Sequence, residues 1–154
     1  MNQDLAYQLF FPEIDCNGKI YRKYSLIRAF IAEGGEYIET WTADGLETTN
    51  YAKKGDFIVQ NLQTEYLESY IIDNNTFFER YGLFYYSENY AICFPKGKVK
   101  AAVYHGEDTE FVAKWGRLMT LKTGDYIVAP YPHLNEVYRI ARKEFLETYE
   151  EDIT

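Results

Sequence analysis

The sequence has few of the residues from which most enzymes build reactive sites. Histidine and cysteine occur only twice each among 154 residues, and Cys16 and Cys93 lack a CxxC spacing. These counts exclude a His-rich metal site and do not fit a zinc site. We expect both thiols to stay reduced, and we expect no cofactor and no metal.

Several catalytic and targeting patterns are absent as well. The chain contains no GxSxG motif, no phosphate-binding loop and no dinucleotide fingerprint. No apolar run approaches the roughly 20 residues that a membrane-spanning helix needs, and no signal peptide is recognisable. We therefore expect a cytoplasmic protein with no membrane partner.

Basic residues are outnumbered. The chain has 16 Lys and Arg against 24 Asp and Glu, a net charge of −8. This balance argues against duplex nucleic acid as a partner, because phosphate neutralisation dominates such binding. Residues 1–86 carry net −6 and residues 87–154 net −2, so an anionic ligand is expected in the second half.

Aromatic residues are abundant. Sixteen Tyr, ten Phe and two Trp make up 18% of the chain. Aromatic side chains favour strands and bring large buried areas, and a chain of this length buries roughly 70% of its surface on folding. The composition therefore predicts a β-rich fold with a substantial core.

The chain also repeats itself. Lys-Gly-Asp-Phe-Ile-Val at 54–59 returns as Thr-Gly-Asp-Tyr-Ile-Val at 123–128, and residues 68–81 align with 136–149 without a gap. Each copy contains one of the two tryptophans. Such self-similarity predicts a duplicated module of about fifty residues. The matched pairs are Glu68/Glu136, Tyr70/Tyr138, Ile72/Ile140, Phe77/Phe145, Glu79/Glu147 and Tyr81/Tyr149.

The repeated Gly-Asp pair predicts a sharp turn. Glycine adopts backbone conformations closed to other residues, and an aspartate carboxylate accepts a local backbone N–H. We favour this structural role for Asp56 and Asp125 over a ligand contact.

Local patterns predict the elements up to residue 97. Residues 1–23 are read as a hairpin extension that turns at Asn17-Gly18. The first module, 24–82, contains a segment at 25–32 that is strand or helix, a hairpin over 37–49, and strands at 57–59 and 68–72. Its closing helix is expected to begin at a Thr76/Glu79 capping box and to end at Gly82. An aromatic hairpin, 83–97, connects to the next module.

The second module, 98–154, follows the same plan. Lys98 and Lys100 alternate with valines and alanines in a predicted strand, and 111–115 pairs with 117–121. A helix over 142–150 places Phe145 and Tyr149 on its inner face, and Glu150 to Asp152 form a solvated tail. The fold class is α+β, mainly antiparallel, with two duplicated modules packed by pseudo-twofold symmetry.

The second module also contains the candidate site. Bases and sugars stack on aromatic rings, and Lys or Arg can hold a phosphate. His133 lies in the loop where the copies diverge, and the basic residues are not shared between the copies. The alternative is that the aromatic residues form the module's own core. The candidate ligand-binding residues are Trp115, Lys114, Arg117, Tyr126, Tyr138, Arg139 and His133.

The Gly-Asp-aromatic-Ile-Val segment, the Glu-x-Tyr strand and the following helix resemble PGDYG-type modules. The resemblance covers residues 53–81 and 122–149. Lys54 and Thr123 replace the family's proline, and Ile58 and Ile127 replace its final glycine. The resemblance implies a small accessory protein of bacteria or phages, and it transfers no catalytic residue.

Three functions follow as hypotheses. The first is a non-enzymatic binding protein for a small anionic, nucleotide-like ligand. The second is an acidic inhibitor of the immunity or anti-defence type, which binds a basic protein partner. The third is a hydrolase that uses carboxylates and His133. A homodimer is left open.

Overall fold

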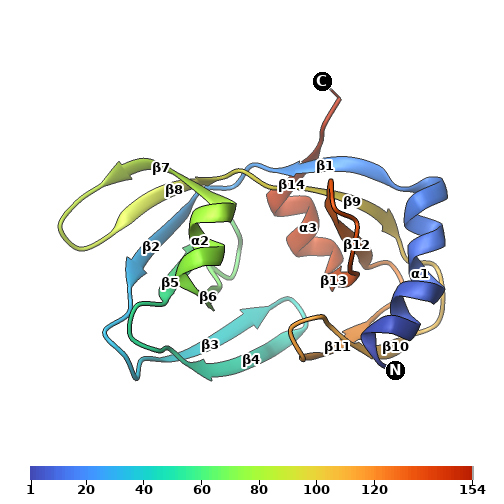
Figure 1. Ribbon diagram of the computed structural model, residues 1–154, viewed down its shortest axis with the longest axis horizontal. Helices are drawn as coiled ribbons and strands as arrows, with labels where there is room; N and C mark the ends of the chain where they lie inside the picture. Colours follow the sequence, from blue (N-terminus) through green and yellow to red (C-terminus); the bar gives the residue numbers. More distant parts are fainter. Residues whose placement is uncertain (154) are drawn as a thin grey trace. The chain divides into compact units, whose positions relative to one another are not determined.

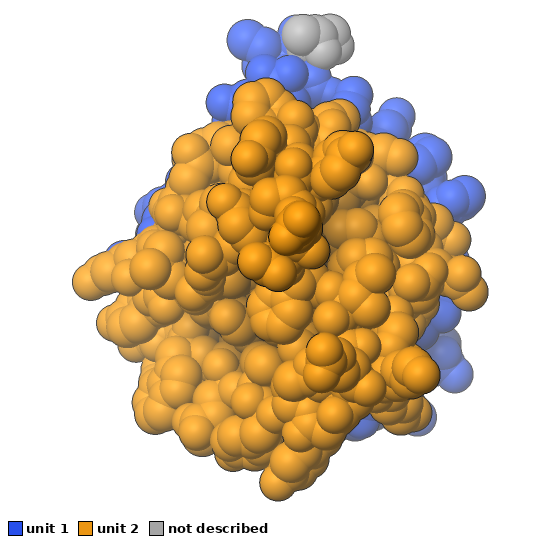
Figure 2. All heavy atoms as spheres, turned by 90° about the vertical axis from the view of Figure 1, so that its left-hand side faces the viewer, with its two compact units in different colours: residues 1–22, 97–154 blue, residues 23–96 orange. Residues whose placement is uncertain are grey.

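The computed structural model describes residues 1–153, apart from the side chains of residues 47 and 48. These residues form three helices and four mainly antiparallel sheets (Figure 1). The predicted α+β class is therefore confirmed. The chain divides into two compact units, unit 1 with residues 1–22 and 97–154 and unit 2 with residues 23–96 (Figure 2).

Unit 2 is built on a five-stranded sheet with the order β6-β5-β2-β8-β7, and β3 and β4 form a separate hairpin. The segment at 25–32 is a strand, the predicted hairpin over 37–49 is present, and the aromatic hairpin at 83–97 lies in the sheet. The elements are β2 (Ile27–Ile31), β3 (Tyr37–Thr42), β4 (Gly45–Tyr51), β5 (Phe57–Asn61), β6 (Ser69–Ile72), α2 (Asn74–Arg80), β7 (Tyr81–Tyr86) and β8 (Ala91–Pro95).

Unit 1 has a five-stranded sheet with the order β13-β12-β9-β1-β14 and a hairpin of β10 and β11. Strand β1, from the beginning of the chain, pairs with β9. The elements are α1 (Gln3–Asn17), β1 (Lys19–Lys23), β9 (Lys98–Val103), β10 (Thr109–Val112), β11 (Leu118–Leu121), β12 (Tyr126–Tyr131), β13 (Tyr138–Ile140), α3 (Arg142–Thr148) and β14 (Tyr149–Glu151).

The hairpin predicted for residues 1–23 is wrong, because most of this segment is helix α1. The side chain of Asn2 caps the helix by accepting the backbone N–H of Leu5 at 2.9 Å. Gly18 has φ −70°, so it does not make the predicted turn, and its N–H donates to the Ile14 carbonyl at 2.9 Å. Pro12 lies on the exposed side of the helix. The buried and half-buried positions repeat every three to four residues, at Gln3, Ala6, Tyr7, Phe10, Phe11 and Ile14.

Helix α2 forms where it was predicted, but both of its ends differ from the prediction. The N-cap is Asp73, whose carboxylate accepts the N–H of Thr76 at 3.0 Å and its hydroxyl at 2.6 Å. These bonds lower the pKa of Asp73 below its ordinary value. The helix ends at Arg80 and the chain passes directly into β7, so Gly82 lies in a strand.

Glu150 and Glu151 are exposed, as a solvated tail requires, but helix α3 ends at Thr148 and not at 150, and residues 149–151 form the edge strand β14 beside β1. The N–H of Asp152 donates to the Ile20 carbonyl at 2.9 Å. Arg22 pairs with Glu150 at 2.6 Å, and Lys98 with Asp152 at 2.5 Å. The acidic residues at the end of the chain therefore meet basic partners on β1 and β9.

The Gly-Asp turns take the predicted structural form in both units. The N–H of Lys53 donates to the Asp56 carboxylate at 3.0 Å, and the N–H of Lys122 donates to the Asp125 carboxylate at 2.8 Å. Gly55 and Gly124 have φ +89° and +94°, values that favour glycine. Each aspartate therefore closes its own turn through the backbone.

Each unit has an aromatic stack between its helix and its sheet. In unit 1 the ring of Phe145 lies 3.8 Å from that of Tyr126 and 4.8 Å from that of Tyr149, measured between centroids. In unit 2 the ring of Phe77 lies 3.8 Å from that of Phe57 and 5.4 Å from that of Tyr81. These rings attach each short helix to one face of its sheet.

Candidate functional site

Two of the predicted ligand-binding residues contact each other on the surface of unit 1. The ring of Trp115 is 55% exposed and meets the ring of Tyr138 edge-on, with 5.7 Å between centroids. The Nζ atom of Lys114 lies 4.0 Å from a carboxylate oxygen of Glu136. This small surface therefore has an exposed aromatic ring beside a lysine that already has an acidic neighbour.

Two other predicted residues are buried and contribute to the core. Tyr126 stacks on Phe145. Arg139 forms an ion pair with Asp125, in which Nε and a terminal nitrogen donate to the same carboxylate oxygen at 3.0 and 2.8 Å. Both side chains of the pair are only 7% exposed. Neither residue presents its polar group on the surface.

The last two predicted residues lie in turns. Arg117 is half-buried, and its carbonyl accepts the N–H of Ala113 at 2.7 Å, which closes the turn before β11. His133 is exposed and follows the cis peptide bond between Tyr131 and Pro132. The structure thus brings Trp115 and Tyr138 together but does not gather the whole predicted set around one cavity.

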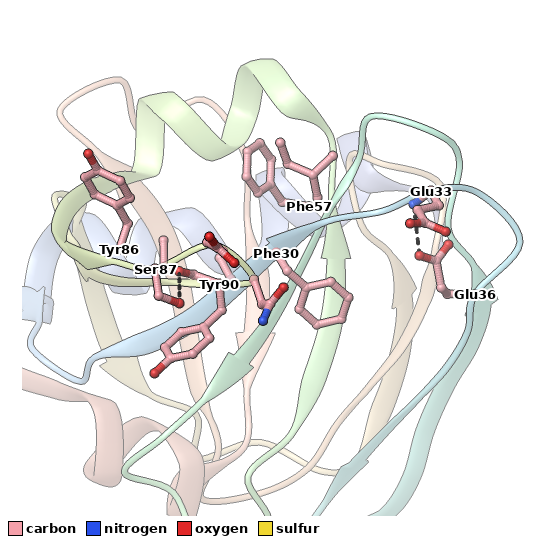
Figure 3. A pocket seen from close by; sticks show the side chains of 12 residues that line it. Phe30, Glu33, Glu36, Phe57, Tyr86, Ser87 and Tyr90 are labelled. Atoms are coloured by element: carbon pink, nitrogen blue, oxygen red, sulfur yellow. Dashed lines mark hydrogen bonds between the residues drawn. The ribbon is translucent and has the colours of Figure 1, made fainter.

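A pocket of about 490 Å³ lies in unit 2, outside the predicted site. Its lining residues come from strands β2, β5, β7 and β8 and from the turns at 33–36 and 87–90 (Figure 3). No Lys, Arg or His occurs among the described residues that line it. The lining residues are Ala29, Phe30, Ile31, Glu33, Glu36, Phe57, Tyr86, Ser87, Glu88, Asn89, Tyr90 and Ala91.

Carboxylates dominate the polar groups of the pocket. The two oxygens of Glu36 accept the backbone N–H groups of Glu33 and Gly34, both at 2.9 Å. These bonds lower the pKa of Glu36, so its carboxylate stays ionised to a lower pH than an ordinary glutamate. Across residues 1–153, no side-chain bond or ion pair engages the carboxylates of Glu33 and Glu88.

The pocket continues into an exposed apolar surface on the face of the sheet that carries α2. Residues paired across neighbouring strands point to the same face. Ile31 pairs with Phe57, whose ring stacks under α2, and Tyr86 pairs with Ala91 in the pocket floor. Helix α2 has only two turns and leaves part of this face uncovered. We call Ile31, Phe78, Leu83 and Tyr86, all exposed, the open face.

A β-bulge in β7 determines which of its side chains lie on the open face. The register of β7 against β8 shifts between Leu83 and Tyr85, which leaves Phe84 as the extra residue. Leu83 and Tyr86 therefore point to the same face although they lie three residues apart. Bulges commonly redirect a side chain in this way. The result is a 70% exposed tyrosine at the rim of the pocket.

Residues 83–97 were predicted as an aromatic connecting hairpin, and this surface was not predicted. A signal was available, because a strand with one buried face alternates apolar and polar residues. Leu83 to Tyr86 are four large apolar or aromatic residues in a row. Such a run exposes apolar side chains unless both faces of the strand are covered.

Several buried polar groups elsewhere in unit 2 bond to one another. Glu68 accepts from the amide of Asn61 at 2.9 Å and from the hydroxyl of Thr64. The hydroxyls of Tyr70 and Tyr81 lie 2.6 Å apart. Burial raises the pKa of Tyr70, so its hydroxyl stays protonated to a higher pH than that of an ordinary tyrosine. These groups are consistent with a structural role.

Residues 1–153 contain no group of three or more His, Cys, Asp or Glu side chains arranged to hold a metal ion. None of the helices in the described part of the chain is long and apolar enough to cross a membrane. Comparisons with family models, with curated proteins and with solved structures found no match to this chain. The resemblance to PGDYG-type modules stays a prediction.

Proposed function

We propose that the protein is a non-enzymatic binding protein that docks a basic protein partner on the open face of unit 2. The observation that carries the proposal is the exposed apolar surface of Ile31, Phe78, Leu83 and Tyr86 beside an acidic pocket. Contiguous exposed apolar surface next to polar groups is typical of protein interaction sites. This function is the acidic inhibitor class predicted from the sequence.

Charge determines the kind of partner. Residues 23–96 contain eleven acidic and six basic residues, a net charge of −5. A basic partner is attracted to such a surface and meets unpaired carboxylates at its edge. A second copy of the chain is a poorer occupant, because each copy carries −8 and the two repel each other.

We also propose that the two units descend from one duplicated module. The sheet orders β6-β5-β2-β8-β7 and β13-β12-β9-β1-β14 correspond strand by strand, with β1 in the place of β8. The Gly-Asp turns and aromatic stacks support the same correspondence. In unit 2 Cys93 lies opposite Ile27, and in unit 1 Tyr21 lies opposite Val99. Cys93 and Tyr21 therefore occupy corresponding positions of the two sheets. Tyr21 packs on Phe145 at 4.9 Å, and unit 2 has a smaller thiol there. The predicted pseudo-twofold packing stays a prediction.

The docking surface can be tested by crosslinking and affinity. A photoreactive phenylalanine analogue in place of Tyr86 should crosslink a protein of net positive charge in a lysate of the source organism. The purified partner should then bind the Leu83→Asp variant at least about tenfold more weakly, because a buried leucine contributes roughly 1.5–3 kcal/mol. Isothermal titration at two salt concentrations should also show weaker binding at high salt.

A matched control is available in unit 1. Leu118 is 58% exposed, the same fraction as Leu83, so Leu118→Asp adds the same charge at an equally exposed leucine. It should leave the affinity within about twofold of the wild type, since isolated surface substitutions have small effects. An equal loss in both variants, or a partner of negative charge, would contradict the proposed surface.

A second candidate function is supported by the exposed Trp115 ring on Tyr138. This surface could stack the base of a small anionic, nucleotide-like ligand, with Lys114 beside it. In a thermal-shift screen of nucleotides, a ligand at 100 times its Kd should add about 2.7 kcal/mol to the unfolding free energy. The shift should disappear in Trp115→Ala and persist in Trp41→Ala, the aligned tryptophan of unit 2. A flat screen would remove this candidate.

A further inference from the structure

The pocket of unit 2 has two chemically different ends. Figure 3 shows Glu33 and Glu36 at one end, Tyr86, Ser87 and Tyr90 at the other, and Phe57 above the space between them. The floor is apolar, with Ala29 and Ala91 paired across β2 and β8. Glu88 adds a carboxylate at the aromatic end, so the whole pocket is negatively charged. A ligand that fits this arrangement has an apolar stem and a positively charged end that meets Glu33 and Glu36.

The charge of the pocket is uncompensated. Glu36 is held in its ionised form by two backbone N–H groups. Glu33, three residues away, and Glu88, in the turn at the other end, add two carboxylates without an ion-pair partner within residues 1–153. The nearest arginine in the sheet is Arg28, which donates to the Gln60 side chain at 2.6 Å and lies over the ring of the lining residue Tyr90, but it forms no ion pair with a carboxylate of the pocket within residues 1–153.

We propose that this pocket is the recognition site for a guanidinium group, presented by an arginine side chain of the basic partner. That the arginine comes from a protein partner rests on the proposed docking function. The chemistry of the pocket does not depend on it. The methylene stem covers the apolar floor, and the planar guanidinium meets the carboxylate end, where it donates two parallel hydrogen bonds.

The aromatic wall favours the same group. Tyr90 already accepts a guanidinium on its ring, since the Cζ atom of Arg28 lies 6.0 Å from the ring centroid. Tyr86 is exposed at the rim and has no such neighbour in the described part of the chain. The volume of about 490 Å³ lies within the common range for ligand pockets, roughly 300–1,000 Å³. It admits an arginine with part of its flanking chain.

The experiment uses the full chain and short neutral-ended peptides, acetyl-Gly-Arg-Gly-amide and its citrulline counterpart, which has the same shape without the charge. Nitrogen-15 NMR titration should show saturable shifts at the amides of 33–36 and 86–91. The arginine peptide should bind on the order of tenfold more tightly than the citrulline peptide, because the carboxylates attract only the charged group. Equal affinity of the two peptides would overturn the proposal.

Charge-matched variants separate the pocket from the general acidity of the protein. Glu33→Gln with Glu88→Gln should weaken the arginine peptide about tenfold. Glu79→Gln with Glu110→Gln removes the same charge from exposed positions outside the pocket and should leave the affinity unchanged. If both pairs weaken binding equally, only the net charge matters and the pocket is not a specific site.

Two further measurements identify the source of the cation. Methylguanidinium and tetramethylammonium should bind more weakly than the arginine peptide; tighter binding of either small cation would overturn the assignment to a protein side chain. With the purified partner, one outcome is that Leu83→Asp loses binding while the Glu33/Glu88 variant keeps it. That result would refute the arginine pocket and leave the docking face standing. Retained binding in both variants would refute the docking face as well.

Discussion

Replacing Phe145 by alanine should lower the unfolding free energy of unit 1 by about 3–5 kcal/mol. The ring is 1% exposed and lies between Tyr126 and Tyr149, with Tyr21 at its edge. Its removal loses the transfer energy of a whole aromatic side chain and leaves a cavity that flat neighbouring rings cannot fill. Thermal unfolding followed by circular dichroism should show a midpoint roughly 10 °C lower.

The aligned helix of unit 2 offers a matched comparison. Phe77 is 5% exposed in the corresponding stack, whereas its neighbour Phe78 is 59% exposed. Phe77→Ala should resemble Phe145→Ala. Phe78→Ala should cost less, about 1–3 kcal/mol, the value of its two edge-on pairs with Phe57 and Phe77. A Phe145→Ala protein within about 1 kcal/mol of the wild type would show that the stack does not hold α3 on the sheet.

Arg139→Met should destabilise the protein by about 3–5 kcal/mol, the cost of removing one partner from a buried ion pair. Asp125 and Arg139 are each 7% exposed. After the substitution the Asp125 carboxylate keeps the N–H of Lys122 but loses both guanidinium donors. Denaturant unfolding measures this change directly, because the midpoint shifts while the slope stays constant.

Two controls accompany this substitution. The double variant Asp125→Asn with Arg139→Met removes the unpaired buried charge of Asp125. It should recover at least half of the unfolding free energy that Arg139→Met loses. In unit 2 the residue aligned with Arg139 is Ile71, so Asp56→Ala removes only a turn bond, worth about 1 kcal/mol. A cost near 1 kcal/mol for Arg139→Met would match an exposed salt bridge and would contradict the buried pair.

The buried Asp125–Arg139 pair limits what an Arg139 substitution can show about ligand binding in unit 1. An Arg139 variant that loses ligand binding would be ambiguous, because the residue supports the sheet through Asp125. Trp115 and Lys114 are the informative positions there, since both are exposed. For the same reason, Tyr126 is better tested as part of the core than as a ligand contact.

Local patterns predicted the elements well where one residue type dictates the backbone. The Gly-Asp turns need only a glycine with positive φ and an adjacent carboxylate, so they form as expected in both units. Helix α1 was missed although its apolar positions repeat with helical spacing. Pro12 and Asn17-Gly18 were read as strand-edge and turn signals. Packing of Ala6 and Ile14 against the core of unit 1 decided in favour of the helix.

The candidate site was harder to predict, because exposure is not a property of a residue type. Trp115 and Tyr126 are both aromatic, yet one is on the surface and the other is in the core. Arg139 was predicted to bind an anion, and its anion turned out to be the carboxylate of Asp125, fourteen residues away. The pocket combines residues from four strands and two turns, which no local pattern relates.

The sequence by itself determined the turns, most strands and the positions of the helices α2 and α3. These features depend on interactions between residues close together in the chain. The tertiary structure decided the place of β1 beside β9, the pairing of Asp125 with Arg139, and the uncovered part of the sheet next to α2. Those outcomes depend on which distant segments pack together, and packing alone determines whether a side chain becomes core, ion pair or binding surface.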